Sequence, residues 1–249
     1  MIGKQRKQGR TTFLLQEDRG AVRIVTMNRP EKRNALNTAL TVGLLGALRA
    51  ADADDSVGAL VLTGAGQAFC AGADLAELKD LQDPKAAEQR AELTMQLHLL
   101  FSKIRLPIVT AINGPAMGGG AGLAIAGEIA LMAESATLGY PEAKHGIVAA
   151  IVMANLVRQA GRKAAFELVS LGEPIGADRA LQLGLVNRVV PGKRLLREAI
   201  KLAEKLAQVQ RPAMVETKRL FHQVADLPLE AALRRARETN VRMRRFAKK

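Results

Sequence analysis

The chain has 249 residues, 48% of them hydrophobic and 24% charged, which is typical of one large globular domain or of a core with a terminal appendage. No apolar run approaches the about 18 residues of a membrane span, no signal-peptide pattern follows the basic start, and a lone Cys70 excludes a disulfide framework and a cysteine-based zinc cluster; we expect a cytoplasmic protein without structural metal. The net charge of +13 is concentrated at the two ends, which suits a phosphorylated ligand, whereas 3% aromatic residues and no tryptophan offer few stacking platforms for nucleic acid.

The first part of the chain predicts alternating strands and helices. A β-hairpin is expected in "FLLQEDRGAVRIVTMN", followed by a loop, "RPEKRN", and a helix that Asn37 caps. A short buried strand is expected in "GALVLTG", and "GAGQAFCAGADL" is a loop that ends where another helix begins. A long helical pattern runs from about Pro84 to Arg105.

The alternation continues through the middle of the chain. Strands are expected in "PIVTAIN" and "EIALMAE", with the glycine-rich helix of "NGPAMGGGAGLAIAG" between them. A strand edge and loop follow in "ATLGYPEAKHG", then a helix in "AAIVMANLVRQAG" that ends at Gly161. After "GLVNRVVP" the pattern contains only helices, with breaks near Pro212 and Pro228. We therefore expect parallel β-α-β units with right-handed crossovers, followed by a helical C-terminal subdomain.

The three consecutive glycines, Gly118 to Gly120, stand at the start of an apolar helical run, where glycine costs stability. A dinucleotide fingerprint fails because the residue that should be the last glycine is Leu123 or Ile125, and no Walker loop is present. Close packing alone does not explain three glycines in a row. Bare amides at a helix start suit an oxygen that becomes negative during a reaction, and the Ala73 amide in the earlier small-residue loop can supply a second donor.

Several polar residues have an ordinary structural interpretation from the sequence alone. Cys70 in "AFCAG" is expected to be a buried packing residue, and Asp74 to cap the helix that follows it. Glu142 follows a turn proline and can be a surface carboxylate. The remaining candidates, expected to be structural or surface residues, are Glu128, Glu134, His98, His145 and His222.

The ordered set "TMNRPEKRNALN", "GAGQAFCAGADL", "NGPAMGGGAGLA", "LGYPEAKHGIV" and "GADRALQLGLVNRVV" resembles the crotonase superfamily of enoyl-CoA hydratases and isomerases over residues 12–249. The resemblance implies an α/β fold, the crotonase-like (ClpP/crotonase) spiral of β-β-α units with a helical C-terminal region, assembled as trimers or dimers of trimers. It divides the chain into a basic tail (1–11), a core (12–191) and a helical subdomain (192–249) for oligomerisation and CoA cover. It also implies an acyl-CoA substrate, with no cofactor beyond the CoA that the substrate carries.

The resemblance assigns roles to matching positions. The amides of Ala73 and Gly119 would hold the thioester oxygen, and Glu142 would move the proton. The substrate and its CoA would contact Lys32, Arg33, Ala35, Ala71, Asp74, Leu75, Gly118, Lys218 and Phe221. Apolar candidates for the acyl pocket are Leu75, Met117, Ile147 and Met153.

One position departs from the two-glutamate hydratases of this family, because Gly122 stands where they carry their first glutamate. Two carboxylates suit water addition, whereas one can shuttle a proton between C2 and C4 as an isomerase does. Some family hydratases also have glycine here, and in these a single glutamate can activate water and return its proton. We therefore expect hydration of the 2,3 double bond, with double-bond isomerisation as one alternative and a non-catalytic protein that binds RNA or a protein partner as another.

Overall fold

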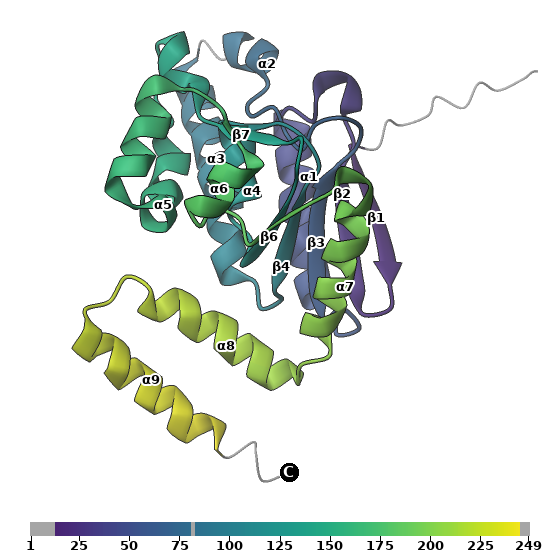
Figure 1. Cartoon of the computed structure of the whole chain (residues 1–249), viewed down its shortest axis with the longest axis vertical. Helices are drawn as coiled ribbons and strands as arrows, with labels where there is room; N and C mark the ends of the chain where they lie inside the picture. Colours follow the sequence, from purple (N-terminus) through teal and green to yellow (C-terminus); the bar gives the residue numbers. More distant parts are fainter. Residues whose placement is uncertain (1–12, 81–82, 245–249) are drawn as a thin grey trace, which may run out of the picture.

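The main sheet has six strands in the order β1-β2-β3-β4-β6-β9. The computed structural model describes residues 13–80 and 83–244, and Figure 1 shows their arrangement; the tail predicted over residues 1–11 lies outside them. Within the sheet, β1 runs antiparallel to β2 and every other pair is parallel. The strands are β1 (Leu14–Arg19), β2 (Val22–Met27), β3 (Ala59–Gly64), β4 (Ile108–Ile112), β6 (Ile129–Ala133) and β9 (Arg188–Val190).

The strand predictions are confirmed, and burial explains their composition. The hairpin pairs Leu14 with Met27 and Arg19 with Val22, and it turns at Gly20, whose φ is +57°. Every residue of β3 and β4 is buried, because helices and loops cover both faces of a parallel sheet. This burial requires continuous apolar runs, which made both strands recognisable from the sequence.

A second, three-stranded sheet was not predicted. It contains β5 (Ala116–Met117), β7 (Thr137–Gly139) and β8 (Ile175–Gly176), with β5 parallel to β7 and β8 antiparallel to β7. Strands of two or three residues are too short to show a hydrophobic period. This small sheet nevertheless positions the site, because it places the residue after Met117 beside the turn that follows Gly139.

Two helices begin at a side-chain cap, and the sequence predicted the first of these caps, Asn37. The Asn37 side chain accepts a hydrogen bond of 2.8 Å from the Leu40 amide at the start of α1, and the Asp83 side chain accepts one from Lys85 at the start of α3. The helices are α1 (Thr38–Ala53), α2 (Leu75–Asp80), α3 (Pro84–Lys103), α4 (Gly119–Ala124), α5 (Ala150–Leu171), α6 (Ala177–Gln182), α7 (Leu195–Ala207), α8 (Arg211–Val224) and α9 (Leu229–Met243), with short 3-10 helices at Pro30–Lys32, Pro141–His145 and Gly192–Arg194.

Element α5 consists of two helical segments that meet at Gly161. This glycine is non-helical, with φ 75° and ψ 167°, so the predicted end of the first segment is confirmed. A second segment, which the sequence did not indicate, continues to Leu171. A lone glycine in a helical pattern can be a cap or a kink, and only the residues packed beyond it decide which.

The C-terminal helices separate into two groups. Helix α7 packs on β2, β3 and β4 and covers the main sheet, whereas α8 and α9 form a hairpin that lies away from the sheet (Figure 1). Arg211 anchors the start of α8 by donating to the Val57 carbonyl, 2.7 Å away. The domain boundary at residue 192 stays a prediction, although α7 belongs to the layer over the sheet. No helix among residues 13–80 and 83–244 is long and apolar enough to cross a membrane.

The break in α5 makes a testable prediction. A β-carbon at Gly161 would meet no atom within 4 Å, so the cost of Gly161→Ala comes from the backbone conformation alone. We expect the free energy of unfolding to fall by about 1–3 kcal/mol in denaturant titrations. Gly46→Ala is the matched control, because Gly46 lies inside α1 with equally open space; it should stabilise the protein by about 1 kcal/mol. Equal effects of the two substitutions would contradict this account.

Candidate active site

The candidate site forms where two backbone segments press together. A β-carbon at Gly72, whose φ is +90°, would lie 2.6 Å from the Met117 carbonyl oxygen, and one at Gly120 would lie 2.2 Å from the Cys70 carbonyl oxygen. The Met117 amide donates to the Cys70 carbonyl at 2.9 Å. The loop before α2 and the start of α4 therefore touch through main-chain atoms, and a side chain at either glycine would force them apart.

This contact brings the two predicted amides together. A β-carbon on Gly119 would lie 4.0 Å from the Ala73 nitrogen, and one on Gly72 would lie 3.5 Å from the Gly119 nitrogen. Within the described residues, neither amide donates a hydrogen bond to a protein acceptor. Gly119 is the first residue of α4, where a helix leaves its amides unpaired and its dipole is positive. Two free donors beside each other can stabilise one oxygen that carries negative charge.

A buried asparagine holds the Ala73 loop in place. Asn34 is fully buried, and its Nδ2 donates to the carbonyls of Ala65 and Ala68, each 2.9 Å away. The Leu36 amide donates to Gly72 at 2.7 Å and Leu36 accepts from the Asp74 amide at 3.1 Å, so the Ala73 amide points away from this loop. Sequence reasoning missed Asn34, because an asparagine in a loop has no distinguishing pattern.

Asp74 has the structural role that the sequence predicts. Its carboxylate accepts from the Ala76 amide at 3.2 Å, near the start of α2, and pairs with Arg29 at 2.9 Å. The Arg29 pair and the Ala76 amide hold the pKa of Asp74 below its ordinary value, although burial opposes them. These contacts join the loop before α2 to the loop after β2.

Glu142 reaches the site from the small sheet. The Gly118 amide donates to the Gly139 carbonyl at 2.8 Å. The chain that follows Gly139 turns through the 3-10 helix Pro141–His145, which contains Glu142. A β-carbon on Gly118, whose φ is +51°, would lie 2.6 Å from Glu142 Oε1. The carboxylate thus covers Gly118, the residue directly before the Gly119 donor. A side chain at Gly118 would therefore collide with the carboxylate.

The environment of Glu142 favours a proton-transfer role. Its Oε2 is buried and has no hydrogen-bond partner among the described residues. Burial raises the pKa of Glu142 above its ordinary value, while a bond from its own backbone and the charge of His145 partly oppose the shift. A carboxylate with a raised pKa is a stronger base, which suits removal of a proton from water or carbon.

The space beside Gly122 is already filled. A β-carbon there would lie 2.4 Å from Val152 Cγ1 and 2.6 Å from His98 Cε1. No larger side chain fits without displacing both neighbours. Sequence reasoning treated His98 as a packing or surface residue, because a histidine in a helical pattern carries no functional signal by itself.

The other residues with a predicted substrate role, apart from the two on α8, differ in how far they are exposed. The Ala71 amide donates to Arg33 at 2.9 Å, so the segments that contain Lys32, Arg33, Ala35 and Ala71 lie against each other, and both basic side chains are exposed. Leu75 and Ile147 are also exposed, at 58% and 48%, next to Asp74 and to the turn of Glu142. Met117 and Met153 are partly buried.

Lys218 and Phe221 lie on α8, in the hairpin. The Lys218 ammonium is buried, donates to the Leu106 carbonyl at 2.7 Å, and lies 3.0 Å from Glu128, which also contacts His222. Burial lowers the pKa of Lys218, and Glu128 opposes this shift. These two partners give Lys218 a structural role within its own chain, and its contact with CoA stays a prediction. Phe221 is 59% exposed, and its role stays a prediction.

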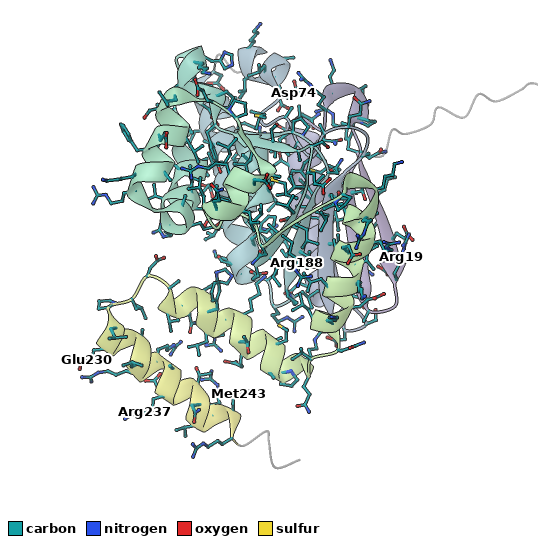
Figure 2. All side chains as sticks on the ribbon, in the orientation of Figure 1. Arg19, Asp74, Arg188, Glu230, Arg237 and Met243 are labelled. Carbon is teal, nitrogen blue, oxygen red and sulfur yellow. The ribbon has the colours of Figure 1, made fainter. Side chains whose placement is uncertain are left out.

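The site and the hairpin lie at opposite ends of the molecule. Figure 2 shows Asp74 beside α2, while Glu230, Arg237 and Met243 of α9 lie at the other end. The C-terminal hairpin therefore does not cover the Ala73 and Gly119 amides of its own chain.

Cys70 has the predicted packing role. It is fully buried, its Sγ donates to the Asn34 carbonyl at 3.1 Å, and burial raises the pKa of the thiol to about 12. A thiol with this pKa stays protonated at neutral pH and is a poor nucleophile.

Comparison with known proteins points to one family. The enoyl-CoA hydratase/isomerase family model matches residues 17–247. A Thermus thermophilus protein with a provisional enoyl-CoA hydratase name is 42% identical over 93% of this chain and 92% of its own length. The 2,3-dehydroadipyl-CoA hydratase of Escherichia coli is 36% identical, over 87% and 84%. A crystal structure of a Mycobacterium smegmatis enoyl-CoA hydratase superposes with a TM-score of 0.89 at 32% identity, covering 93% of this chain and 91% of that one.

The structural role of Lys218 can be tested by Lys218→Met. This change leaves the Glu128 charge buried without its cation, so we expect the free energy of unfolding to fall by about 3 kcal/mol in denaturant titrations. The matched control is Arg219→Met, which removes an exposed pair with Glu216 and should cost less than about 0.5 kcal/mol. An unchanged stability together with a raised KM for an acyl-CoA would instead support the original CoA role.

Proposed function

Because the chain belongs to the enoyl-CoA hydratase/isomerase family, we propose that it adds water across the 2,3 double bond of an enoyl-CoA thioester, with Glu142 as its single acid and base. The observation that carries this proposal is the meeting of three groups at one turn. The amides of Ala73 and Gly119 lie beside each other, and the Glu142 carboxylate covers the residue before Gly119.

The proposed reaction has two steps. Glu142 takes a proton from water as the water oxygen bonds to C3, and the electrons of the double bond move to the thioester oxygen. The Ala73 and Gly119 amides stabilise this enolate oxygen, a contribution of about 3 kcal/mol for each such donor. Glu142 then returns the proton to C2, and the carbonyl forms again.

Charge and apolar surface near the site support the substrate class. Lys32 and Arg33 are exposed on the loop that the Ala71 segment contacts, which suits the phosphates of CoA. Leu75 and Ile147 offer apolar surface to an acyl chain on the two segments that flank the site. The proposed chemistry uses no cofactor beyond the CoA of the substrate. The cytoplasmic location expected from the sequence stays a prediction.

Double-bond isomerisation is the second candidate. The observation that favours it is the filled space at Gly122, which leaves Glu142 as the carboxylate that lies against this face of α4. A single carboxylate can move a proton between C4 and C2 of a 3-enoyl thioester through the same enolate. This chain is an enzyme of the family, so a non-catalytic protein that binds RNA or a protein partner is not supported.

We also propose that the protein assembles as a trimer or a dimer of trimers through its C-terminal hairpin. Helix α9 packs against α8, yet large apolar side chains of the hairpin stay between 43% and 75% exposed. These residues are Phe221, Leu227, Leu229, Leu233 and Val241. An apolar surface of this extent is typical of a protein interface.

Incubation with substrates tests the reaction. A 2-enoyl-CoA should gain the mass of one water, and a 3-enoyl-CoA incubated separately reveals any isomerisation. Glu142→Gln should lower kcat by about 10²- to 10⁴-fold with little change in KM, because the amide cannot take a proton. Glu134→Gln, an exposed carboxylate after β6, is the matched control and should leave the rate unchanged. A normal rate for Glu142→Gln would contradict the proposal.

Stability measurements show whether Glu142→Gln folds. Since burial raises the pKa of the folded carboxyl, the folded state binds the proton more tightly than the unfolded state does. The ionised side chain therefore destabilises the fold above both pKa values, and this effect fades as the pH falls below them. We expect the variant to be more stable than the parent at neutral pH, with the difference shrinking in acid.

Light scattering tests the assembly. The mass in solution should be three or six times the 26.7 kDa of the chain. Leu233→Glu should shift it towards the monomer, because the charge would have to be buried at the interface. The control is Leu15→Glu, since Leu15 is 49% exposed on the edge strand β1, and it should leave the mass unchanged. A monomeric parent protein would contradict the proposal.

A further inference from the structure

Two ionisable side chains contact two glycines, Gly118 and Gly122, of the glycine-rich segment. The Gly122 amide donates to the Gly118 carbonyl at 2.9 Å, so these glycines are one helical turn apart. Glu142 Oε1 lies over Gly118, and His98 Cε1 lies over Gly122. Backbone positions one helical turn apart are about 5 Å from each other along the axis, so Glu142 and His98 contact neighbouring parts of the same short segment.

Each of these side chains has a buried polar atom without a partner. His98 Nε2 and Glu142 Oε2 have almost no accessible surface, and neither has a hydrogen-bond partner among the described residues. Buried polar atoms without partners are rare in native proteins and frequently mark functional sites or ordered water. Here two of them belong to side chains from distant parts of the chain, α3 and the turn after β7, which contact Gly122 and Gly118.

The unpartnered nitrogen lies on the buried side of the ring. His98 also borders a cavity of about 910 Å³ between α3, α5 and α8. Nε2 itself has almost no solvent exposure, so it does not open into that cavity. Cε1, the ring atom over Gly122, is bonded directly to Nε2, which places this nitrogen beside α4.

The charge state of His98 suits a role beside a carboxylate. Burial lowers the pKa of His98 to about 4, so the imidazole is neutral at neutral pH. A neutral imidazole nitrogen can donate or accept one hydrogen bond according to its tautomer. A second carboxylate at this place would accept hydrogen bonds only, and its charge would repel that of Glu142.

We propose that His98 is a positioning residue for hydration, and that its Nε2 holds the water molecule that Glu142 activates by one hydrogen bond. This proposal rests on the hydration reaction proposed above. The water oxygen bonds to C3, its proton passes to Glu142 and then to C2, and His98 neither gains nor loses a proton overall. Gly122 is required because its missing side chain leaves room for the imidazole.

The test compares two reactions of the full-length protein. Hydration of a 2-enoyl-CoA needs the bound water. Exchange of the C2 hydrogen of a saturated acyl-CoA in D₂O needs Glu142 and the two amides, but no addition of water to C3. A positioning role for His98 therefore separates the two rates, whereas general damage to the fold lowers both.

Two variants give the expected pattern. His98→Leu should lower kcat for hydration by about 10- to 100-fold, the loss of one strong hydrogen bond to a reacting group, with little change in KM and no change in C2 exchange. His98→Gln keeps a hydrogen-bonding group and should recover most of the rate. His98→Leu should unfold at an equal or higher temperature than the parent, because it removes a buried polar atom without a partner.

Met95→Leu is the matched control, since Met95 lies on the same helix and borders the same cavity. It should change neither reaction. Hydration at the parental rate in His98→Leu, or an equal loss of hydration and exchange, would overturn the role of His98. A parent protein that exchanges the C2 hydrogen but adds no water would instead refute the proposed hydration, and the role of His98 with it.

Discussion

The close approach of two backbone segments is the constraint on which the site depends. Residues 70–74 and 117–120 meet largely through carbonyl oxygens and glycine α-carbons. Glycines at the start of α4 cost conformational entropy, and the surrounding buried strands must compensate for that cost. In return, the Ala73 and Gly119 amides lie beside each other without protein acceptors, which no arrangement of bulkier residues would allow.

Buried polar groups in this structure follow two patterns. Asn34 and Lys218 are satisfied by carbonyls and carboxylates, and they hold loops and helices in place. Tyr140, Glu142 and His98 each keep a buried polar atom without a partner among the described residues, at a cost of about 1–3 kcal/mol for each atom. The other such atoms are single nitrogens of Arg29 and Arg211, whose neighbouring guanidinium nitrogens are bonded. The side chains of Glu142 and His98 contact Gly118 and Gly122, beside the candidate site, where a substrate or water would satisfy their unpaired atoms.

The candidate site and the C-terminal hairpin lie at opposite ends of the molecule (Figure 2). The amides and Glu142 lie at the carboxyl side of the small sheet, whereas α8 and α9 extend from the other end (Figure 2). Helix α8 is fastened by Arg211 at its start and by Lys218 in its middle, and Arg158 pairs with Asp226 just beyond its end. These contacts attach the hairpin to the rest of the chain while its large apolar side chains stay exposed, as the proposed assembly requires.

Local sequence patterns were sufficient for much of this description. Continuous apolar runs predicted β3 and β4, and Asn37 predicted the start of α1, because these signals act within a few residues. Ordered motifs indicated the family, and with it the roles of Ala73, Gly119 and Glu142. Contacts between distant segments were not predictable in this way. The two-residue strands, the burial of Lys218 against Glu128, and the imidazole of His98 over Gly122 each depend on side chains that meet only after folding, and no short-range pattern encodes such a meeting.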